Sequence, residues 1–318
     1  MSVDYDNINS VLSIFDEQAH QFKEKPYLWR KINDKYASLS WSEVHDQVCK
    51  LALALSGLGI LNGDRVIIVS ENRPEWQIAD LAIMAVGAIT VPAYITNGVA
   101  DHRHVLEDSG ASAVIISTPA LAEKVLPAAQ EAACVKCAIT MDVIPEDRTH
   151  GISTHLWNTL IASQNNGMAT LEAAAHDIAR NDTACLIYTS GTGGTPKGVM
   201  LSHNSFSSYI LANVEPVDME MAERNVLSVP LHHIAGMQAV MAAIYGGRAL
   251  VLQRQFDEEG WMKLVQEEKV NRAMMVPTML KRLMDQPTFK DYDLSSLQVI
   301  TYGAAPMPLE VIKKAILE

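Results

Sequence analysis

The stretch of this chain with the clearest chemical potential is a loop rich in glycine and hydroxyl residues that also holds one lysine. It runs from Thr189 to Gly198 and reads Thr-Ser-Gly-Thr-Gly-Gly-Thr-Pro-Lys-Gly. Glycines let backbone N–H groups approach an anion closely, while hydroxyl groups and a lysine add donors and positive charge. The residues that carry these groups are Thr189, Ser190, Gly191, Thr192, Gly193, Gly194, Thr195 and Lys197. The pattern favours a polyphosphate-binding loop.

Other phosphate and nucleophile motifs do not match this loop. A Walker A lysine follows a glycine and precedes Ser or Thr, whereas Lys197 lies between Pro196 and Gly198. The dinucleotide pattern fails because Pro196 stands where its third glycine belongs. A hydrolase elbow around Ser190 would need glycines two residues away on both sides. A flexible surface linker is the remaining alternative, although a linker rarely has a lysine directly after a proline between two apolar strands, as Lys197 follows Pro196 here.

Apolar segments on both sides of the loop predict the strands that hold it. Ala184–Tyr188 predicts a buried strand before the loop, and Val199–Leu201 predicts another buried strand after it. A loop held at both ends can present its tip to a ligand.

From Tyr188 to Gly198 the chain resembles the signature loop of the adenylate-forming ligase superfamily, which includes acyl-CoA synthetases, nonribosomal adenylation domains and luciferases. That signature reads Tyr-Thr-Ser-Gly-Thr-Thr/Ser-Gly-x-Pro-Lys-Gly. The chain departs from it at Gly193, where the family usually has a second hydroxyl residue. The change removes one side-chain donor and loosens the backbone, which allows a weaker or slower grip on the nucleotide.

A histidine pair follows the predicted strand Val226–Val229, in the segment Pro230-Leu-His-His-Ile-Ala-Gly236. The family usually shows Pro-Leu-Phe-His-x-x-Gly here, so His233 matches the family histidine and His232 replaces its aromatic neighbour. In the family this segment borders the carboxylate substrate and the passage for coenzyme A. We expect His233 to be catalytic, donating to a substrate carboxylate oxygen as the adenylate forms. The alternative, a histidine that only caps or packs, is our interpretation of His232.

Small residues follow another predicted strand, Leu297–Tyr302. The residues are Gly303, Ala304, Ala305 and Pro306, and their backbone groups could meet a purine edge. The segment looks like the family's Gly-Gly/Ala-Ala-Pro stretch, which contacts the adenine and one wall of the acyl pocket. Without the resemblance, a small-residue turn before a proline-capped helix would be the default interpretation. Val276-Pro277-Thr278 is similar to the family stretch on the acyl side, or simply opens a helix.

Strands and helices alternate along most of the chain. A helical pattern at Asn7–Lys23 and a hairpin at Tyr27–Leu39 precede a capping box formed by Ser40 and Glu43. Apolar strands then alternate with helices between residues 65 and 139, and again after the loop. We predict an α/β fold of two parallel-sheet subdomains, residues 1–180 and residues 181–318, the second beginning with the phosphate loop and incomplete at its C-terminus. A cleft between them would hold ligands at strand C-terminal ends.

Composition limits the class of protein. The chain has 318 residues, 48% of them hydrophobic and 19% charged, which indicates a folded globular protein. Its net charge of −12 argues against a nucleic-acid partner. Its cysteines do not suggest a disulfide framework, and Cys134 and Cys137 lack the further ligands of a zinc site. Reduced thiols and an N-terminus without a signal-peptide pattern favour the cytoplasm. The apolar run Ile78–Ile95 contains Asp80 and Pro92, so a helix and a strand explain it better than a membrane span.

The resemblance implies an ATP-dependent carboxylic acid–CoA ligase that uses ATP, Mg²⁺ and coenzyme A. Its substrate would be a medium- or long-chain fatty acid or an aryl acid, and a homodimer is compatible with it. In the family a Mg²⁺-holding Glu, a ribose-binding Asp and a C-terminal lid domain with a catalytic Lys follow the Gly303–Pro306 segment. We therefore expect this chain to be the N-terminal part alone, without metal ligands and incompetent for the full reaction. The alternatives are a non-catalytic nucleotide- or acyl-binding fragment or scaffold, and a nicotinamide-dependent oxidoreductase, which the failed glycine pattern disfavours.

Overall fold

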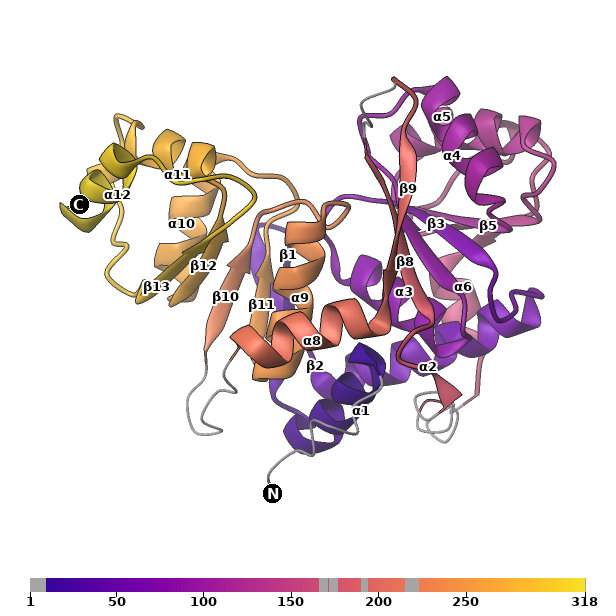
Figure 1. Cartoon of the computed structure of the whole chain (residues 1–318), viewed down its shortest axis with the longest axis horizontal. Coiled ribbons are helices and arrows are strands. Elements are labelled where there is room, and N and C mark those ends of the chain that lie inside the picture. The colour runs from indigo at the N-terminus through magenta and orange to yellow at the C-terminus, as the bar shows by residue number, and fades with distance from the viewer. Residues whose placement is uncertain (1–9, 166–170, 172–176, 190–193, 215–222, 318) are drawn as a thin grey trace.

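The chain forms two sheets with helices packed around them, as predicted for the α/β class (Figure 1). The structure is a computed structural model that describes residues 10–165, 171, 177–189, 194–214 and 223–317. None of the helices within these ranges combines the length and apolar character needed to cross a membrane.

The first sheet has seven strands in the order β7-β6-β5-β3-β4-β8-β9. Every neighbouring pair in it is parallel except β8 and β9, which form an antiparallel hairpin at one edge. Its strands are β3 (Arg65–Val69), β4 (Ile89–Pro92), β5 (Ala113–Ile116), β6 (Cys137–Thr140), β7 (Thr154–Leu156), β8 (Thr183–Thr189) and β9 (Lys197–Ser202).

Helices cover both faces of this sheet, which explains why its central strands are apolar throughout. Alternate side chains of β3 point to opposite faces: Val66 and Ile68 belong to one apolar cluster, whereas Ile67 and Val69 belong to the other. In Figure 1, α4 and α5 lie on the opposite side of the sheet from α2 and α3. The helices are α2 (Trp41–Gly57), α3 (Pro74–Ala85), α4 (Val99–Ser109), α5 (Pro119–Glu131) and α6 (Trp157–Ala162), with the short 3-10 helix η2 (Glu146–Arg148).

The second sheet has six strands in the order β13-β12-β10-β11-β1-β2. Only β1 and β2 are antiparallel; they form the predicted hairpin, whose turn residues Asn33 and Asp34 have φ angles of 48° and 64°. Two consecutive left-handed residues are typical of a turn that matches the twist of a hairpin. The strands are β1 (Pro26–Ile32), β2 (Lys35–Ser40), β10 (Arg224–Leu227), β11 (Ala249–Leu252), β12 (Arg272–Met275) and β13 (Val299–Tyr302).

Helices around both sheets begin where local sequence signals place them. Ser40 and Glu43 form the predicted capping box at the start of α2, and the Asp257 side chain accepts a hydrogen bond from the backbone N–H of Gly260 at the start of α10. The remaining helices are α1 (Val11–Phe22), α8 (His203–Asn213), α9 (Ile234–Gly246), α10 (Glu258–Glu268), α11 (Pro277–Met284) and α12 (Leu309–Leu317), with the 3-10 helix η3 (Phe289–Asp291).

Strand pairing crosses the predicted boundary at residue 180 in both directions. The hairpin β1–β2 pairs with β11 in the second sheet, whereas β8 and β9 complete the first sheet. One apolar cluster also contains side chains of both sheets, for example Ile68 of β3 and Leu250 of β11. The division into residues 1–180 and 181–318 stays a prediction about domains, but it does not separate the sheets.

Candidate functional site

The two ends of the predicted phosphate loop lie on the β8–β9 hairpin at the edge of the first sheet. Thr189 lies opposite Lys197 in the strand register, and Tyr188 lies opposite Gly198. The strand after the loop was predicted to be buried, and this is wrong: β9 is largely exposed, with Val199 at 45% and Met200 at 69%. As the outermost strand of its sheet, β9 has a neighbouring strand on one side only.

The described part of the loop is accessible. Thr189, Gly194, Thr195 and Lys197 are all exposed, and Gly194 has a φ of 86°, a left-handed conformation that glycine adopts without strain. No carboxylate among the described residues forms an ion pair with Lys197, so its ammonium group remains available to an anion. The predicted residues Ser190, Gly191, Thr192 and Gly193 lie outside the described residues.

Helix α4 holds both strands of this hairpin. The hydroxyl of the buried Tyr188 on β8 donates to Asp108 Oδ2 at 2.6 Å. The pKa of Tyr188 is raised, mainly by burial and also by the adjacent Asp108 carboxylate. One helical turn earlier, His104 Nε2–H donates to the carbonyl oxygen of Pro196 at 2.9 Å, just before β9. Sequence reasoning missed both residues. Their spacing of four on one helix was the available signal.

The predicted catalytic histidine lies at the start of α9. His233 is the N-cap residue of this helix, it is exposed, and its side chain makes no capping hydrogen bond. The rings of His233 and His232 each lie about 5 Å from the ring of Tyr94, with centroid distances of 4.9 and 5.0 Å. Tyr94 follows strand β4 of the other sheet, so this aromatic cluster joins segments from both sheets.

Burial keeps both histidines of this pair neutral. It lowers the pKa of His233, and with the neighbouring His233 it lowers the pKa of His232 to about 4. A neutral imidazole can donate one hydrogen bond and accept another. His232 is buried, and within the described part of the chain its Nδ1 atom has no hydrogen-bond partner. His233 can therefore reach a ligand, whereas His232 packs behind it.

A buried asparagine, Asn72, positions the histidine segment. Asn72 Nδ2 donates to the carbonyl oxygens of Val229 and Gln253 at 3.1 and 3.2 Å. Its Oδ1 accepts from the backbone N–H of Leu231 at 3.0 Å. Because Asn72 follows β3, while these partners follow β10 and β11, one side chain joins the C-terminal strand ends of both sheets.

The predicted adenine segment follows β13, the edge strand of the second sheet. The Gly303 N–H donates to the Met275 carbonyl at 3.4 Å, and Ala304 has a φ of 67°. Ala304, Ala305 and Pro306 are exposed. The segment and the β8–β9 loop belong to different sheets, and no hydrogen bond joins their described residues. Their shared contact with one nucleotide stays a prediction.

A groove of about 490 Å³ runs between α8, α9 and the face of β10, β12 and β13. Its lining includes Ala239, Ala242 and Met274, and it ends at Thr301 and Tyr302, directly before Gly303. The nearby methionines Met237, Met241 and Met275 are buried in the core.

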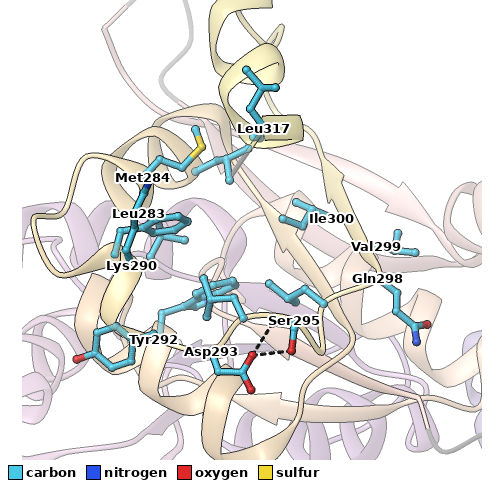
Figure 2. A pocket seen from close by; sticks show the side chains of 16 residues that line it. Leu283, Met284, Lys290, Tyr292, Asp293, Ser295, Gln298, Val299, Ile300 and Leu317 are labelled. Atoms are coloured by element: carbon cyan, nitrogen blue, oxygen red, sulfur yellow. Dashed lines mark hydrogen bonds between the residues drawn. The ribbon is translucent and has the colours of Figure 1, made fainter.

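A larger cavity of about 760 Å³ contains no predicted site residue. It lies between α11, α12 and β13, and Figure 2 shows Leu283, Ile300 and Leu317 around it. On its polar side, Asp293 Oδ1 accepts hydrogen bonds from the backbone N–H and the hydroxyl of Ser295, at 3.1 and 2.5 Å (Figure 2).

The residues beside the hairpin do not make a Mg²⁺ site on their own. The described loop residues offer hydroxyl groups and a lysine, whereas Mg²⁺ in proteins is held by carboxylates and phosphates. Asp108, the α4 carboxylate that contacts the hairpin, already accepts from Tyr188. These residues therefore do not form a ligand set for a catalytic metal ion.

Comparisons with known proteins give a family match and several relatives. A family model described as "AMP-binding enzyme" matches residues 15–316. The chain is 29% identical over 278 residues to a feruloyl-CoA synthase of Amycolatopsis sp, covering 87% of this chain and 51% of that protein. It is 28% identical over 268 residues to a medium/long-chain-fatty-acid–CoA ligase of Mycobacterium tuberculosis, covering 84% and 46%.

A solved structure shares the fold. It is the inhibitor-bound N-terminal domain of a protein named FACL13 from Mycobacterium tuberculosis, with a TM-score of 0.75 and 24% identity, covering 97% of this chain and 73% of that one. The chain spans about half the length of the curated relatives it matches.

Proposed function

The chain belongs to the AMP-binding enzyme family, and from this membership we propose that the whole protein is an ATP-dependent carboxylic acid–CoA ligase. In the first step a carboxylate oxygen of the acid attacks the α-phosphorus of ATP, and pyrophosphate leaves. In the second step the sulfur of coenzyme A attacks the acyl carbonyl carbon, and AMP leaves. The proposed acid is a medium- or long-chain fatty acid or an aryl acid, and the proposed compartment is the cytoplasm, which suits the free cysteines.

The exposed residues at the loop end of the β8–β9 hairpin are the observation that carries this proposal. Thr189, Thr195 and Lys197 lie at this end, where hydroxyl groups and a cation can bind the β- and γ-phosphates. Catalysis of adenylate formation needs mainly placement and charge neutralisation of the triphosphate. Contacts from α4 to both strands of the hairpin hold the turn in position.

The remaining substrate groups are assigned to the strand ends of the second sheet. We assign the adenine to Gly303–Pro306 and the acyl group to the groove along α9, whose Ala239, Ala242 and Met274 offer an apolar lining. His233 would donate an N–H to a carboxylate oxygen, because its pKa is lowered and its imidazole stays neutral. Mg²⁺, when bound with ATP, would neutralise phosphate charge.

The test is ATP–pyrophosphate exchange with a panel of medium-chain, long-chain and aryl acids. It should be run on this chain and on a full-length relative in parallel, with acyl-CoA detected by mass spectrometry. We expect this chain to bind ATP but to exchange pyrophosphate far more slowly than the relative. Exchange at the relative's rate would contradict the predicted incompetence of the chain, and failure to bind ATP would contradict the nucleotide site.

A second candidate is a non-catalytic nucleotide- or acyl-binding protein. Its basis is that the exposed loop end of the β8–β9 hairpin and the groove along α9 could bind these ligands without catalysis. Saturable binding of ATP or of an acid without exchange under any condition tested would support it over the ligase.

A further inference from the structure

Three metal-ligating side chains lie together on the helices α1 and α2, away from the proposed nucleotide site. Asp16 and His20 are one helical turn apart on α1, and His45 faces them from α2. His45 Nε2 lies 2.8 Å from Asp16 Oδ1, and His20 Nδ1 lies 3.7 Å from Asp16 Oδ2. One donor atom from each of the three residues lies within 4.8 Å of the other two.

The charge of Asp16 needs a partner in this position. Asp16 is 9% exposed, and its ion pairs in the described part of the chain are both with imidazoles, those of His20 and His45. A carboxylate withdrawn from water requires a compensating cation. A protonated imidazole can supply that charge, and so can a metal ion bound by two neutral imidazoles and the carboxylate.

A further contact orients the buried histidine. Cys49 Sγ lies 3.6 Å from His45 Nδ1, on the opposite side of the ring from Asp16. With Nδ1 directed to the cysteine, Nε2 is the nitrogen left to face an ion between the helices. Metal-binding histidines commonly have such an outer contact at the second ring nitrogen, which sets the tautomer and the ring orientation.

We propose that Asp16, His20 and His45 form a binding site for one divalent transition-metal ion, with Zn²⁺ as the best match. Two imidazole nitrogens and a carboxylate oxygen suit Zn²⁺, whereas Mg²⁺ and Ca²⁺ prefer oxygen ligands. The His20 side chain is 56% exposed, so the site is open to solvent and can bind water as a fourth ligand. His20 would exchange its hydrogen bond to the Asp16 carbonyl for the ion.

The ion would join two helices that belong to different parts of the fold. α1 also contacts α9, where Gln18 Nε2 donates to the Tyr245 carbonyl at 2.9 Å, and α2 packs against α3 and α6. Binding should therefore raise the melting temperature of the whole chain. The site does not depend on the proposed ligase activity.

The first experiment is a calorimetric titration of tag-free, EDTA-treated protein with Zn²⁺. We expect one ion per chain. His20→Ala should weaken binding at least tenfold, because removal of one ligand leaves only two (about 10–100-fold is typical even for outer contacts). Glu17→Ala, which removes an exposed acidic neighbour on the same helix, is the matched control and should leave the affinity unchanged.

The second experiment uses Co²⁺ as a visible probe of ligand identity. A four-coordinate site should give a d–d absorption band that His20→Ala and His45→Gln abolish and Glu17→Ala keeps. Circular dichroism of each variant checks that it is folded. If the buried substitution His45→Gln prevents folding, His20→Ala still tests the site, because it changes an exposed side chain. Absence of saturable Zn²⁺ binding, or equal affinity in His20→Ala and Glu17→Ala, would overturn the proposal.

Discussion

Lys197 is placed to attract an anion because its side chain is exposed at the first residue of β9, opposite Thr189. Lys197→Met keeps the length of the side chain and removes its charge. We expect the affinity for ATP to fall roughly tenfold or more, since hydrogen bonds to charged groups contribute about 1.5–3 kcal/mol. Equilibrium binding of a fluorescent ATP analogue measures the change.

Lys263→Met provides the control for that experiment. Lys263 is an exposed lysine of α10 that pairs with Glu267 on the same helix, and it belongs to the second sheet's helices. If both variants bind ATP equally well, the loop does not hold the triphosphate.

Asn72 satisfies three buried backbone groups with one side chain. Asn72→Ala leaves the Leu231 N–H and two carbonyls without this partner. Its unfolding free energy should fall by about 2–4 kcal/mol, because each unpaired buried polar group costs about 1–3 kcal/mol. Urea denaturation measures the loss. Asn213→Ala, at the exposed end of α8, should change stability by no more than about 0.5 kcal/mol. A similar small change for Asn72→Ala would show that water replaces its hydrogen bonds.

At the level of secondary-structure elements, α4 supports the β8–β9 hairpin through the hydrogen bonds from His104 to Pro196 and from Tyr188 to Asp108. His104→Ala removes the bond to the Pro196 carbonyl, so the turn loses a support but no ligand group. We expect ATP affinity to fall roughly threefold to tenfold, while the unfolding free energy changes by about 1 kcal/mol or less.

His104→Gln, which can still donate a hydrogen bond, should recover part of that affinity. His155→Ala on β7, at the far edge of the same sheet, is the control. If His104→Ala loses stability but keeps its ATP affinity, the contact serves folding alone.

Helix α3 is buried along its length and contains an acidic residue in its interior, Asp80. Burial raises the pKa of Asp80 from 3.8 to about 7. Between about pH 4 and pH 7 the folded protein therefore keeps a proton that the unfolded chain loses, and stability falls as pH rises through this window.

Asp80→Asn should remove this dependence. The stability of the variant relative to the natural protein should increase from pH 4 to pH 7 by on the order of 4 kcal/mol, since one pKa unit corresponds to about 1.4 kcal/mol. Urea unfolding at a series of pH values gives the difference between the two proteins. A constant difference would mean that Asp80 is ionised in the folded state.

For the molecule as a whole, the exchange of hairpins between the two sheets predicts that the halves depend on each other. A fragment of residues 181–318 would lack β1 and β2 of its own sheet, and its β8 and β9 would have no sheet to join. We expect this fragment and residues 1–180 to be unfolded or aggregated when produced separately, and to form native-like structure when mixed.

Circular dichroism and two-dimensional NMR spectra of each fragment and of the mixture test this expectation. The full chain should unfold in one cooperative transition by calorimetry, because one apolar cluster spans both sheets. Dispersed spectra from either fragment alone would instead support domains divided at residue 180.

Local features of this protein were predictable from the sequence. The hairpin at Tyr27–Leu39, the Ser40–Glu43 capping box and the alternation of strands and helices between residues 65 and 139 were all predicted, and the structure has them. Such features depend on side-chain periodicity and on neighbours within a few residues, which the order of amino acids records directly.

The pairing of distant segments required the three-dimensional structure. The exposure of β9, the bridge made by Asn72, the contacts from His104 and Asp108, and the meeting of Asp16 with His45 were all missed. Except for the exposure of β9, these features join residues 29 to 181 positions apart. Which strand lies at an edge, and which polar groups face each other when buried, depends on how the sheets and helices pack together. Periodicity along the chain carries no record of that packing.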